Sequence, residues 1–564
     1  MQPFRTDRPR DDPTFSGIAR CLPSDRQRDD MFDSDSIDVA PPLTAALPRL
    51  QPLAGARAIA RPLAIAALVS VSLAIRMWGL GAASLAEDEV NKLRAAEAYD
   101  RGDLSANAEH PLLMKAAIWA SRRATQPFGV SPEAAVRLPN ALAGAATTGV
   151  VFLLAESLFD TAVGGWAAAA WTLDLNAAAI NRIAKEDTFL LFFLLLASYW
   201  FERAKRLPRG DPAAGRWYRR SAAGFGLMAA SKYMPHYFGL HAVFNYAADD
   251  NPADKTPDKR WTFYAAVVGV FLLANAPLLL PSTWHYLAEY VRGDTLRHTG
   301  YRFAHQLFVN TMPATPWGLP WRFYLTFFAT KVPLASLVAG AIGLVWVARH
   351  PSHRGATFVR VFLVLTLLPY SLVASKFVRY MLPMLAVVDI AAGVGAAWIV
   401  TALARRIGGA YRAPLVAACA LCFIAPSAAQ IAEIGPYYGL AQNAVGARLA
   451  PRGSLFPDDE LYDAGMGEAV AAVAAVAARG AVVCSDATEV VGEYLARHGR
   501  PDVTPCSIAH DGLPMTRVET WVIAQDGHTY FESDAVIDAL RRRLAPWRVV
   551  RVAGVSAVQV YRVQ

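Results

Sequence analysis

Residues 62–80 read PLAIAALVSVSLAIRMWGL, an apolar run that carries a single charged side chain, Arg76. A helix needs about 20 mostly apolar residues to cross the hydrocarbon core of a membrane. The run is longer than the ~7–15 apolar residues of a signal-peptide core, so we expect an uncleaved membrane anchor. Similar runs recur along the chain. The candidate spans are 62–80, 137–158, 162–181, 187–202, 220–232, 234–248, 261–281, 323–348, 357–374, 379–400 and 412–430.

The composition agrees with a membrane protein of about eleven transmembrane helices. Of the 564 residues, 54% are apolar and 18% are charged, whereas soluble domains average about 45–50% and about 25%. This excludes a disordered, collagen-like or coiled-coil chain for the bulk of the sequence. Five cysteines are too few for a disulfide scaffold. The net charge of +8 does not indicate nucleic-acid binding, because cations beside apolar runs have the same effect.

Lys and Arg in short loops predict the orientation, since such loops stay in the cytoplasm. The loop 203–219 is rich in them, which favours a cytoplasmic N-terminus. With eleven spans the C-terminus would be extracytoplasmic, and the expected location is the plasma (inner) membrane. We therefore expect a disordered cytoplasmic tail over 1–60 and a transmembrane domain over 61–430. The domain includes a large first outer loop, 81–136. An extracytoplasmic α/β domain would fill 431–564.

The hydrophobic periods outside the spans predict short elements. In the first outer loop we expect helices at 90–99 and 112–124. The C-terminal region alternates helices and strands. The expected helices are 464–479, 489–498 and 533–544, and the strands are 481–485, 520–524, 547–552 and 557–563. Cys484 and Cys506 would form a disulfide if the fold brings them together, and Gly393-Val394-Gly395 is expected to pack membrane helices.

The parity of the spans places several charged clusters at one face of the membrane. They are Glu87-Asp88-Glu89, Glu109-His110, Arg182 to Asp187, Lys232-Tyr233, Lys376 to Tyr380 and a loop with Arg297, His298 and His305. Buried charges near a membrane should pair or line a watery cavity. Carboxylates beside cations suit transfer from a lipid phosphate, since a carboxylate activates a hydroxyl and cations bind phosphate. Helix capping, loop ion pairs and snorkelling lysines remain the ordinary alternatives. No compact zinc-ligand spacing occurs, and the metal is left unassigned.

The order of these motifs resembles the GT-C membrane glycosyltransferases of the protein O-mannosyltransferase and aminoarabinose lipid A transferase type (glycosyltransferase family 39-like). The resemblance covers roughly 62–520. It rests on Asp88-Glu89 after the first span, Glu109-His110-Pro111-Leu112, Arg137-Leu138-Pro139, Arg182 to Asp187, Ser231-Lys232-Tyr233, Lys331-Val332-Pro333-Leu334, Arg379 to Pro383, and Pro436-Tyr437-Tyr438 with Asn443. Each motif is short, and the ordered set is what is specific.

The resemblance implies a GT-C-like fold and inverting transfer of a sugar from a polyprenyl-phosphate donor to an extracytoplasmic acceptor. The acceptor would be a protein, lipid A or a cell-envelope glycan. Asp88 would be the base, Glu89 its support and Asp187 a second acid. The donor phosphate would contact Lys232 and Arg379, with Lys376 and Arg182 behind them. Other substrate contacts are expected from His110, Lys185, Tyr233 and His298.

Further consequences of the resemblance concern cofactors and partners. Some relatives use a divalent cation, so the resemblance leaves such a cofactor open. The partners would be the lipid-linked donor, membrane lipids and the acceptor, with no nucleic acid. A transporter or flippase of a lipid-linked sugar is the main alternative, although no repeated halves are visible. A non-catalytic scaffold with an outer binding domain is the third hypothesis.

Overall fold

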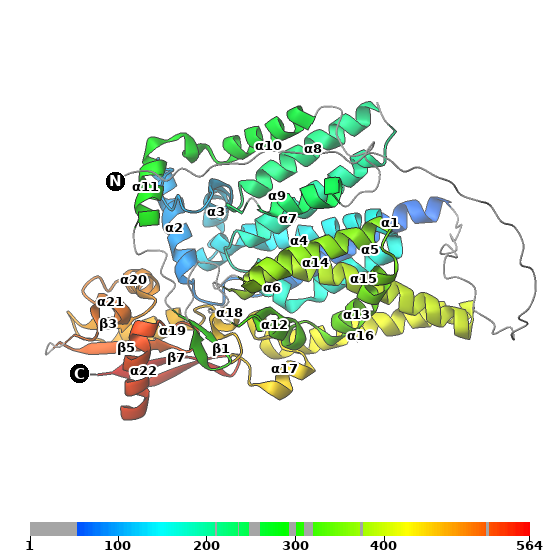
Figure 1. The fold of residues 1–564 in the computed structure, drawn as a ribbon. Coiled ribbons are helices and arrows are strands. Elements are labelled where there is room, and N and C mark those ends of the chain that lie inside the picture. The colour runs from blue at the N-terminus through cyan, green and yellow to red at the C-terminus, as the bar shows by residue number, and fades with distance from the viewer. Residues whose placement is uncertain are drawn as a thin grey trace, which may run out of the picture. The chain divides into compact units, whose positions relative to one another are not determined.

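The computed structural model describes residues 54–208, 211–234, 236–247, 260–292, 300–308, 320–372, 376–514 and 518–563. Most of the predicted tail and the loop containing His298 lie outside these residues. Helices predominate, and a small sheet is built from the C-terminal residues (Figure 1). Along the chain the first elements are α1 (Ala54–Met77), α2 (Glu87–Asp100), α3 (Leu112–Thr125), η1 (Gln126–Phe128) and α4 (Pro132–Leu158). The two helices predicted in the first outer loop are thus confirmed as α2 and α3.

Each predicted span contains a helix, and three of the spans are broken. In 261–281 an α-helix ends at Ala274 and a 3-10 helix follows. Residues 162–181 form α5 (Thr161–Leu173) and α6 (Leu175–Asn181) instead of one helix. Asp174 causes the break, because its carboxylate accepts hydrogen bonds from the amides of Asn176 and Ala177 and so caps α6. Residues 323–348 form α12 (Phe323–Lys331) and α13 (Leu334–Arg349), which meet at 118°. Val332 is extended there, as expected of a residue before a proline.

The remaining helices follow the predicted order. They are α7 (Asp187–Lys205), α8 (Pro212–Ala229), α9 (His236–Ala242) with the π-helix η2 (Val243–Ala247), α10 (Arg260–Ala274), η4 (Ala276–Leu279), α11 (Pro281–Arg292), α14 (Arg354–Leu372), η6 (Val378–Met381), α15 (Leu382–Ile407), η7 (Gly409–Tyr411) and α16 (Arg412–Ile434). Among the described residues, five helices are long and apolar enough to cross a membrane, or six with the bent pair. The chain is an integral membrane protein, and the count of eleven spans stays a prediction.

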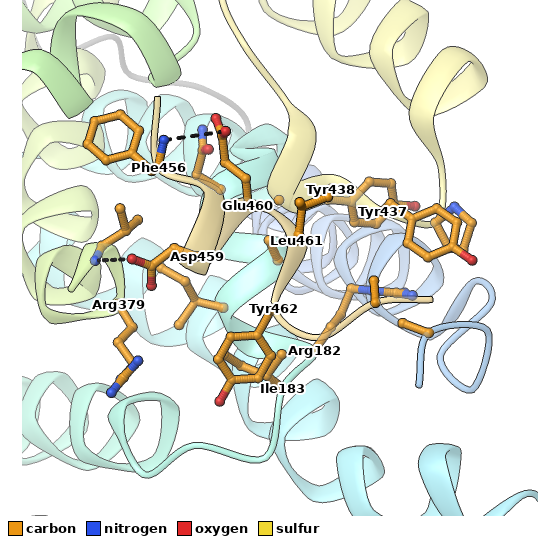
Figure 2. Close-up of a pocket in the computed structure, with 18 of the residues that line it drawn as sticks. Arg182, Ile183, Arg379, Tyr437, Tyr438, Phe456, Asp459, Glu460, Leu461 and Tyr462 are labelled. Atoms are coloured by element: carbon orange, nitrogen blue, oxygen red, sulfur yellow. Dashed lines mark hydrogen bonds between the residues drawn. The ribbon is translucent and has the colours of Figure 1, made fainter. Parts of the chain in front are cut away.

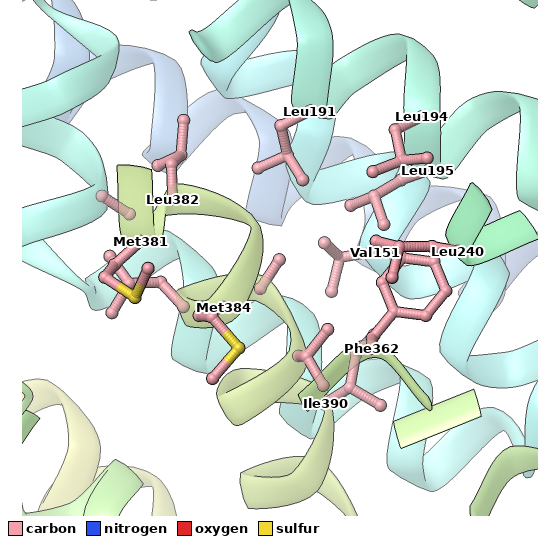
Figure 3. Packing of buried hydrophobic residues seen from close by; sticks show 14 of the residues in the cluster. Val151, Leu191, Leu194, Leu195, Leu240, Phe362, Met381, Leu382, Met384 and Ile390 are labelled. Atoms are coloured by element: carbon pink, nitrogen blue, oxygen red, sulfur yellow. The ribbon is translucent and has the colours of Figure 1, made fainter. Parts of the chain in front are cut away.

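Helix α15 packs closely against α5 and α13 through small residues. A side chain at Gly395 would overlap the carbonyl oxygen of Ala339, and one at Gly393 would come within 2.7 Å of the carbonyl oxygen of Val163. The prediction of a glycine packing element is therefore confirmed. Around it, apolar side chains of α4, α7, α9, α14 and α15 form one buried cluster (Figure 3).

The residues after α16 return to the membrane helices before they form the sheet. They contain η8 (Tyr438–Leu440), α17 (Ala444–Leu449) and α18 (Pro457–Leu461). The sheet has the order β4-β3-β5-β7-β6. Its strands are β3 (Val482–Ser485), β4 (Thr504–Ser507), β5 (Thr520–Gln525), β6 (Arg548–Val552) and β7 (Val555–Arg562). The accompanying helices are α19 (Met466–Val476), α20 (Thr488–Arg497), α21 (Ile508–Asp511) and α22 (Phe531–Arg543).

All seven elements predicted after residue 460 are present within a few residues of the expected ends. Strand β4 was missed, because Pro505 interrupts its apolar pattern. It pairs in parallel with β3, which places Cys484 opposite Cys506, and these two cysteines form a disulfide. A separate hairpin of β1 (Tyr301–Phe303) and β2 (Gln306–Phe308) was also missed.

Candidate active site

Asp88 lies in the first turn of α2, beside several cations from distant parts of the chain. Its carboxylate forms an ion pair with Lys185, and the hydroxyl oxygen of Tyr462 lies 3.5 Å from Asp88 Oδ2. Burial opposes ionisation, but the charges of Lys185, Lys92 and Arg379 hold the pKa of Asp88 well below its usual range. The Asp88 side chain is nevertheless 38% exposed. Asp88 is therefore an ionised carboxylate that a substrate can reach.

Glu89, the next residue, has a different environment. Its side chain is fully buried and accepts two hydrogen bonds from Arg137 of α4, at 2.6 and 2.9 Å. It also accepts the amides of Ala86 at 3.1 Å and Ala184 at 2.9 Å. Four donors saturate this carboxylate, so it joins α2, α4 and the loop before α7.

A second pair of buried charges supports the Asp88 cluster. Lys92, one turn further along α2, lies 3.1 Å from Glu186, and both side chains are buried. His110 Nδ1 lies 3.2 Å from the same Glu186 oxygen. Burial lowers the pKa of His110 to about 3, so its imidazole is neutral. Lys92 was missed from the sequence, although its position four residues after Asp88 on one helix face was a usable signal.

Lys232 and Asp187, which were predicted separately as site residues, form an ion pair. Lys232 Nζ lies 2.7 Å from Asp187 Oδ1 and 4.8 Å from the centre of the Tyr380 ring. Tyr233, beside it, is partly exposed, and its hydroxyl accepts a hydrogen bond of 2.8 Å from Asn275. The turn after α8 thus faces the residues just after Arg379.

Arg379 lies in η6 and stacks on aromatic rings. Its guanidinium carbon is 3.9 Å from the centre of the Phe377 ring. Among the described residues, no carboxylate lies within ion-pair distance of it. Lys376, three residues earlier, is fully buried. Arg379 is therefore a cation with no direct ion pair among the described residues, although the charges of Asp88 and Asp459 act on it from further away.

Beside Arg379 is a cavity of about 90 Å³ between the membrane helices and the segment after α16 (Figure 2). Its charged lining residues are Arg137, Arg182, Lys331, Arg379, Asp459 and Glu460, and its aromatic ones are Tyr437, Tyr438, Phe456 and Tyr462. Arg182 donates hydrogen bonds to the carbonyls of Arg76, Trp78 and Gly79 at 2.7–2.9 Å. It thereby fixes the end of α1, and no carboxylate neutralises it among the described residues. Neither Tyr462 nor Asp459 was recognised from the sequence.

Among the described residues, two acidic side chains of the candidate site are arranged as partners of lysines and do not form a ready-made site for a divalent cation. Within the described ranges, no three His, Cys, Asp or Glu side chains converge as metal ligands would. Asp88 and Asp187 each have a lysine as their partner. A lysine ammonium occupies the place that a cation would need.

Part of the chain matches a known protein family. Residues 109–279 match the family described as dolichyl-phosphate-mannose-protein mannosyltransferase. No curated protein sequence matches the chain. The match includes His110, Arg182, Asp187 and Lys232, and it ends well before Arg379.

Similar solved structures include ArnT from Cupriavidus metallidurans bound to undecaprenyl phosphate, at 16% identity and a TM-score of 0.46. That alignment covers 90% of this chain and 98% of ArnT. The archaeal oligosaccharyltransferase AglB from Archaeoglobus fulgidus, in complex with an inhibitory peptide and a dolichol-phosphate, has 10% identity and a TM-score of 0.50. Here 83% of this chain and 70% of AglB are covered. Residues 109–279 are thus similar to this mannosyltransferase family, and the likeness to AglB shows a shared fold.

Proposed function

We propose that the chain is an inverting glycosyltransferase that moves a sugar from a polyprenyl-phosphate donor to an extracytoplasmic acceptor. The acceptor would be a protein, lipid A or a cell-envelope glycan. The observation that carries the proposal is Asp88, an ionised and partly exposed carboxylate surrounded by Lys185, Lys92 and Arg379. A base and a set of phosphate-binding cations are the two elements that such a transfer requires.

In the proposed reaction, Asp88 accepts the proton of an acceptor hydroxyl while that oxygen attacks the anomeric carbon of the donor sugar. The bond between the anomeric carbon and the phosphate oxygen breaks, and its electron pair leaves with the polyprenyl phosphate. A single displacement of this kind inverts the anomeric configuration. The products are the glycosylated acceptor and the free polyprenyl phosphate.

Arg379 is the leading candidate for the donor phosphate, because it has no carboxylate partner among the described residues. A guanidinium can donate two parallel hydrogen bonds to phosphate oxygens. Lys232 already forms an ion pair with Asp187. It would therefore interact with the donor phosphate and with Asp187 at the same time. Lys376 and Arg182 are less suited to bind the phosphate. Lys376 is fully buried, and Arg182 donates its hydrogen bonds to backbone carbonyls.

Donor binding would also activate Asp88. In the free protein, nearby cations hold the pKa of Asp88 far down, which makes it a weak base. A phosphate bound at Arg379 brings negative charge that offsets these cations. The pKa of Asp88 would then rise towards the range in which a carboxylate accepts a proton effectively. This arrangement couples base strength to the presence of the donor.

The test is incubation of the purified protein with a panel of polyprenyl-phosphate sugars and measurement of free polyprenyl phosphate. We expect release with one donor class and its loss in Asp88→Asn. Asp100→Asn is the matched control, because Asp100 ends the same helix and pairs with Arg123 on the exposed surface. An active Asp88→Asn protein would contradict the base assignment. Substrate counterflow in proteoliposomes without chemistry would instead favour the transporter hypothesis.

A further inference from the structure

The segment Pro457–Asp463, which reads PDDELYD, is bonded to several distant elements. We name it the acidic strap. Four of its carboxylates bond to four different elements around the cavity. Asp458 accepts the amide of Arg302 in β1 at 2.9 Å, Asp459 the amide of Val378 in η6 at 3.0 Å, Glu460 the ammonium of Lys331 in α12 at 2.6 Å, and Asp463 the amide of Glu87 in α2 at 3.1 Å.

Two of these bonds hold the elements that carry the proposed catalytic groups. Asp459 fixes the first residue of η6, which is the neighbour of Arg379. Asp463 fixes the first residue of α2, which is the neighbour of Asp88. The strap therefore sets the distance between the proposed base and the proposed phosphate-binding arginine. These two hydrogen bonds from the strap link η6 to α2.

Between these two anchors the backbone turns through a conformation that is rare for large side chains. Tyr462 has φ of 44° and Asp463 has φ of 58°. Left-handed geometry at a bulky non-glycine residue costs free energy and persists where surrounding contacts enforce it. Its consequence is the direction of Tyr462, whose hydroxyl lies 3.5 Å from Asp88 Oδ2. Figure 2 shows Tyr462 beside Arg379 at the cavity wall.

We propose that Tyr462 is a positioning residue for Asp88, and that the acidic strap holds it together with Arg379 in one geometry. This inference rests on the proposed function. Burial and the Asp88 charge raise the pKa of Tyr462 well above its ordinary value, so the hydroxyl stays protonated and can donate. The titratable groups that act on Asp88 include Glu87 and Lys92 of its own helix, His110, Lys185 of the loop before α7, and Arg379 of η6. Tyr462 adds a neutral hydroxyl donor to this set.

The experiment compares Tyr462→Phe with Tyr99→Phe. Tyr99 is a buried tyrosine of α2 whose hydroxyl has no hydrogen-bond partner among the described residues. We expect Tyr462→Phe to lower kcat about tenfold, because Asp88 is no longer held in one position and the cost of a misplaced base exceeds the gain in its basicity. The donor KM should change less than about twofold, since the phosphate contacts remain. Tyr99→Phe should match the wild type.

The pH dependence separates positioning from a purely structural effect. A hydrogen bond to the charged form of a carboxylate lowers its pKa, so removing the Tyr462 hydroxyl should raise the pKa of Asp88. The acid limb of the kcat profile should then move to higher pH, whereas loss of folded protein would scale the whole profile without moving it. Asp459→Leu should instead raise the donor KM, because the turn that carries Arg379 is released.

The outcomes distinguish the two proposals. A Tyr462→Phe enzyme with wild-type kcat and an unmoved acid limb overturns the positioning role, while the wild-type activity upholds the transferase. A wild-type protein that releases no polyprenyl phosphate from any donor overturns both. The last control is thermal unfolding in detergent. The unfolding midpoint of Tyr462→Phe should lie within a few degrees of that of the wild type.

Discussion

Asp88 and Glu89 are neighbours in the sequence with the same charge, yet their surroundings are opposite. Glu89 is fully buried and saturated by Arg137 and two backbone amides. Asp88 is 38% exposed, and its cation Lys185 comes from a loop that also faces other charges. A saturated buried ion pair fixes structure, because any change leaves a buried charge unpaired. An exposed carboxylate with surplus cations around it remains available for chemistry. The difference separates a buried structural ion pair from an exposed carboxylate within one helical turn.

The largest expected effect comes from Asp88. Asp88→Asn should lower the transfer rate by about 10³-fold, a typical contribution of a general base, while thermal stability stays near that of the wild type. Polyprenyl-phosphate release and detergent-phase unfolding measure the two quantities. If the loss of activity is explained by loss of folded protein, Asp88 has a structural role like that of Glu89, and the contrast between the two residues is wrong.

Glu89→Ala should have the opposite signature. It leaves Arg137 buried without its carboxylate partner, which costs about 3–5 kcal/mol of unfolding free energy. Folded yield and the unfolding midpoint should drop sharply. Arg123→Ala, which breaks the exposed pair with Asp100, should change stability by less than about 1 kcal/mol. Equal stability losses in the two variants would remove the distinction between the buried ion pair and the surface pair.

Arg379 tests the surplus of positive charge beside Asp88. Arg379→Ala should raise the donor KM by about tenfold or more, and Arg379→Lys should fall between, because lysine cannot form two parallel bonds to phosphate. Initial rates at varied donor concentration give the values. An unchanged donor KM in Arg379→Ala would contradict this assignment and would indicate that Lys232 or Lys376 binds the phosphate.

The smallest effect is a shift of the alkaline limb of activity. Burial lowers the pKa of Lys185 to about 8, so its ammonium is charged below that pH and neutral above it. Loss of this charge weakens the positive field that would bind the donor phosphate, so activity should decline as the pH rises through about 8. Lys185→Arg stays charged and should move the limb to higher pH. A limb that does not move in Lys185→Arg would assign it to another group.

Much of the architecture could be read from hydrophobic periodicity. The helices of the first outer loop and the strands and helices after residue 460 were located within a few residues, because each depends on local pattern and length. Breaks inside spans were harder. The break at Asp174 depends on a side chain capping the next helix, and an apolar window of ~20 residues averages over such a residue.

For the candidate site, the sequence indicated several of the residues but not how they contact one another. Asp88, Lys185, Asp187, Lys232 and Arg379 were all named from charge at the ends of spans, and their roles remain proposals. Lys92, Tyr462 and Asp459 were not, because a lysine on a helix face or a tyrosine after the last span has no local mark of function. His298 lies outside the described residues.

The sequence by itself determined the kind of protein, since apolar runs of membrane length and short alternating segments are local properties of the chain. Only the tertiary structure decided which charges meet. Tyr462 and Asp88 are 374 positions apart, and Glu89 finds its arginine 48 positions away, on another helix. Such pairings depend on how the helices pack against one another and on which of them the acidic strap contacts. Packing and burial, which no local pattern encodes, placed one of two adjacent carboxylates in a buried ion pair and left the other exposed.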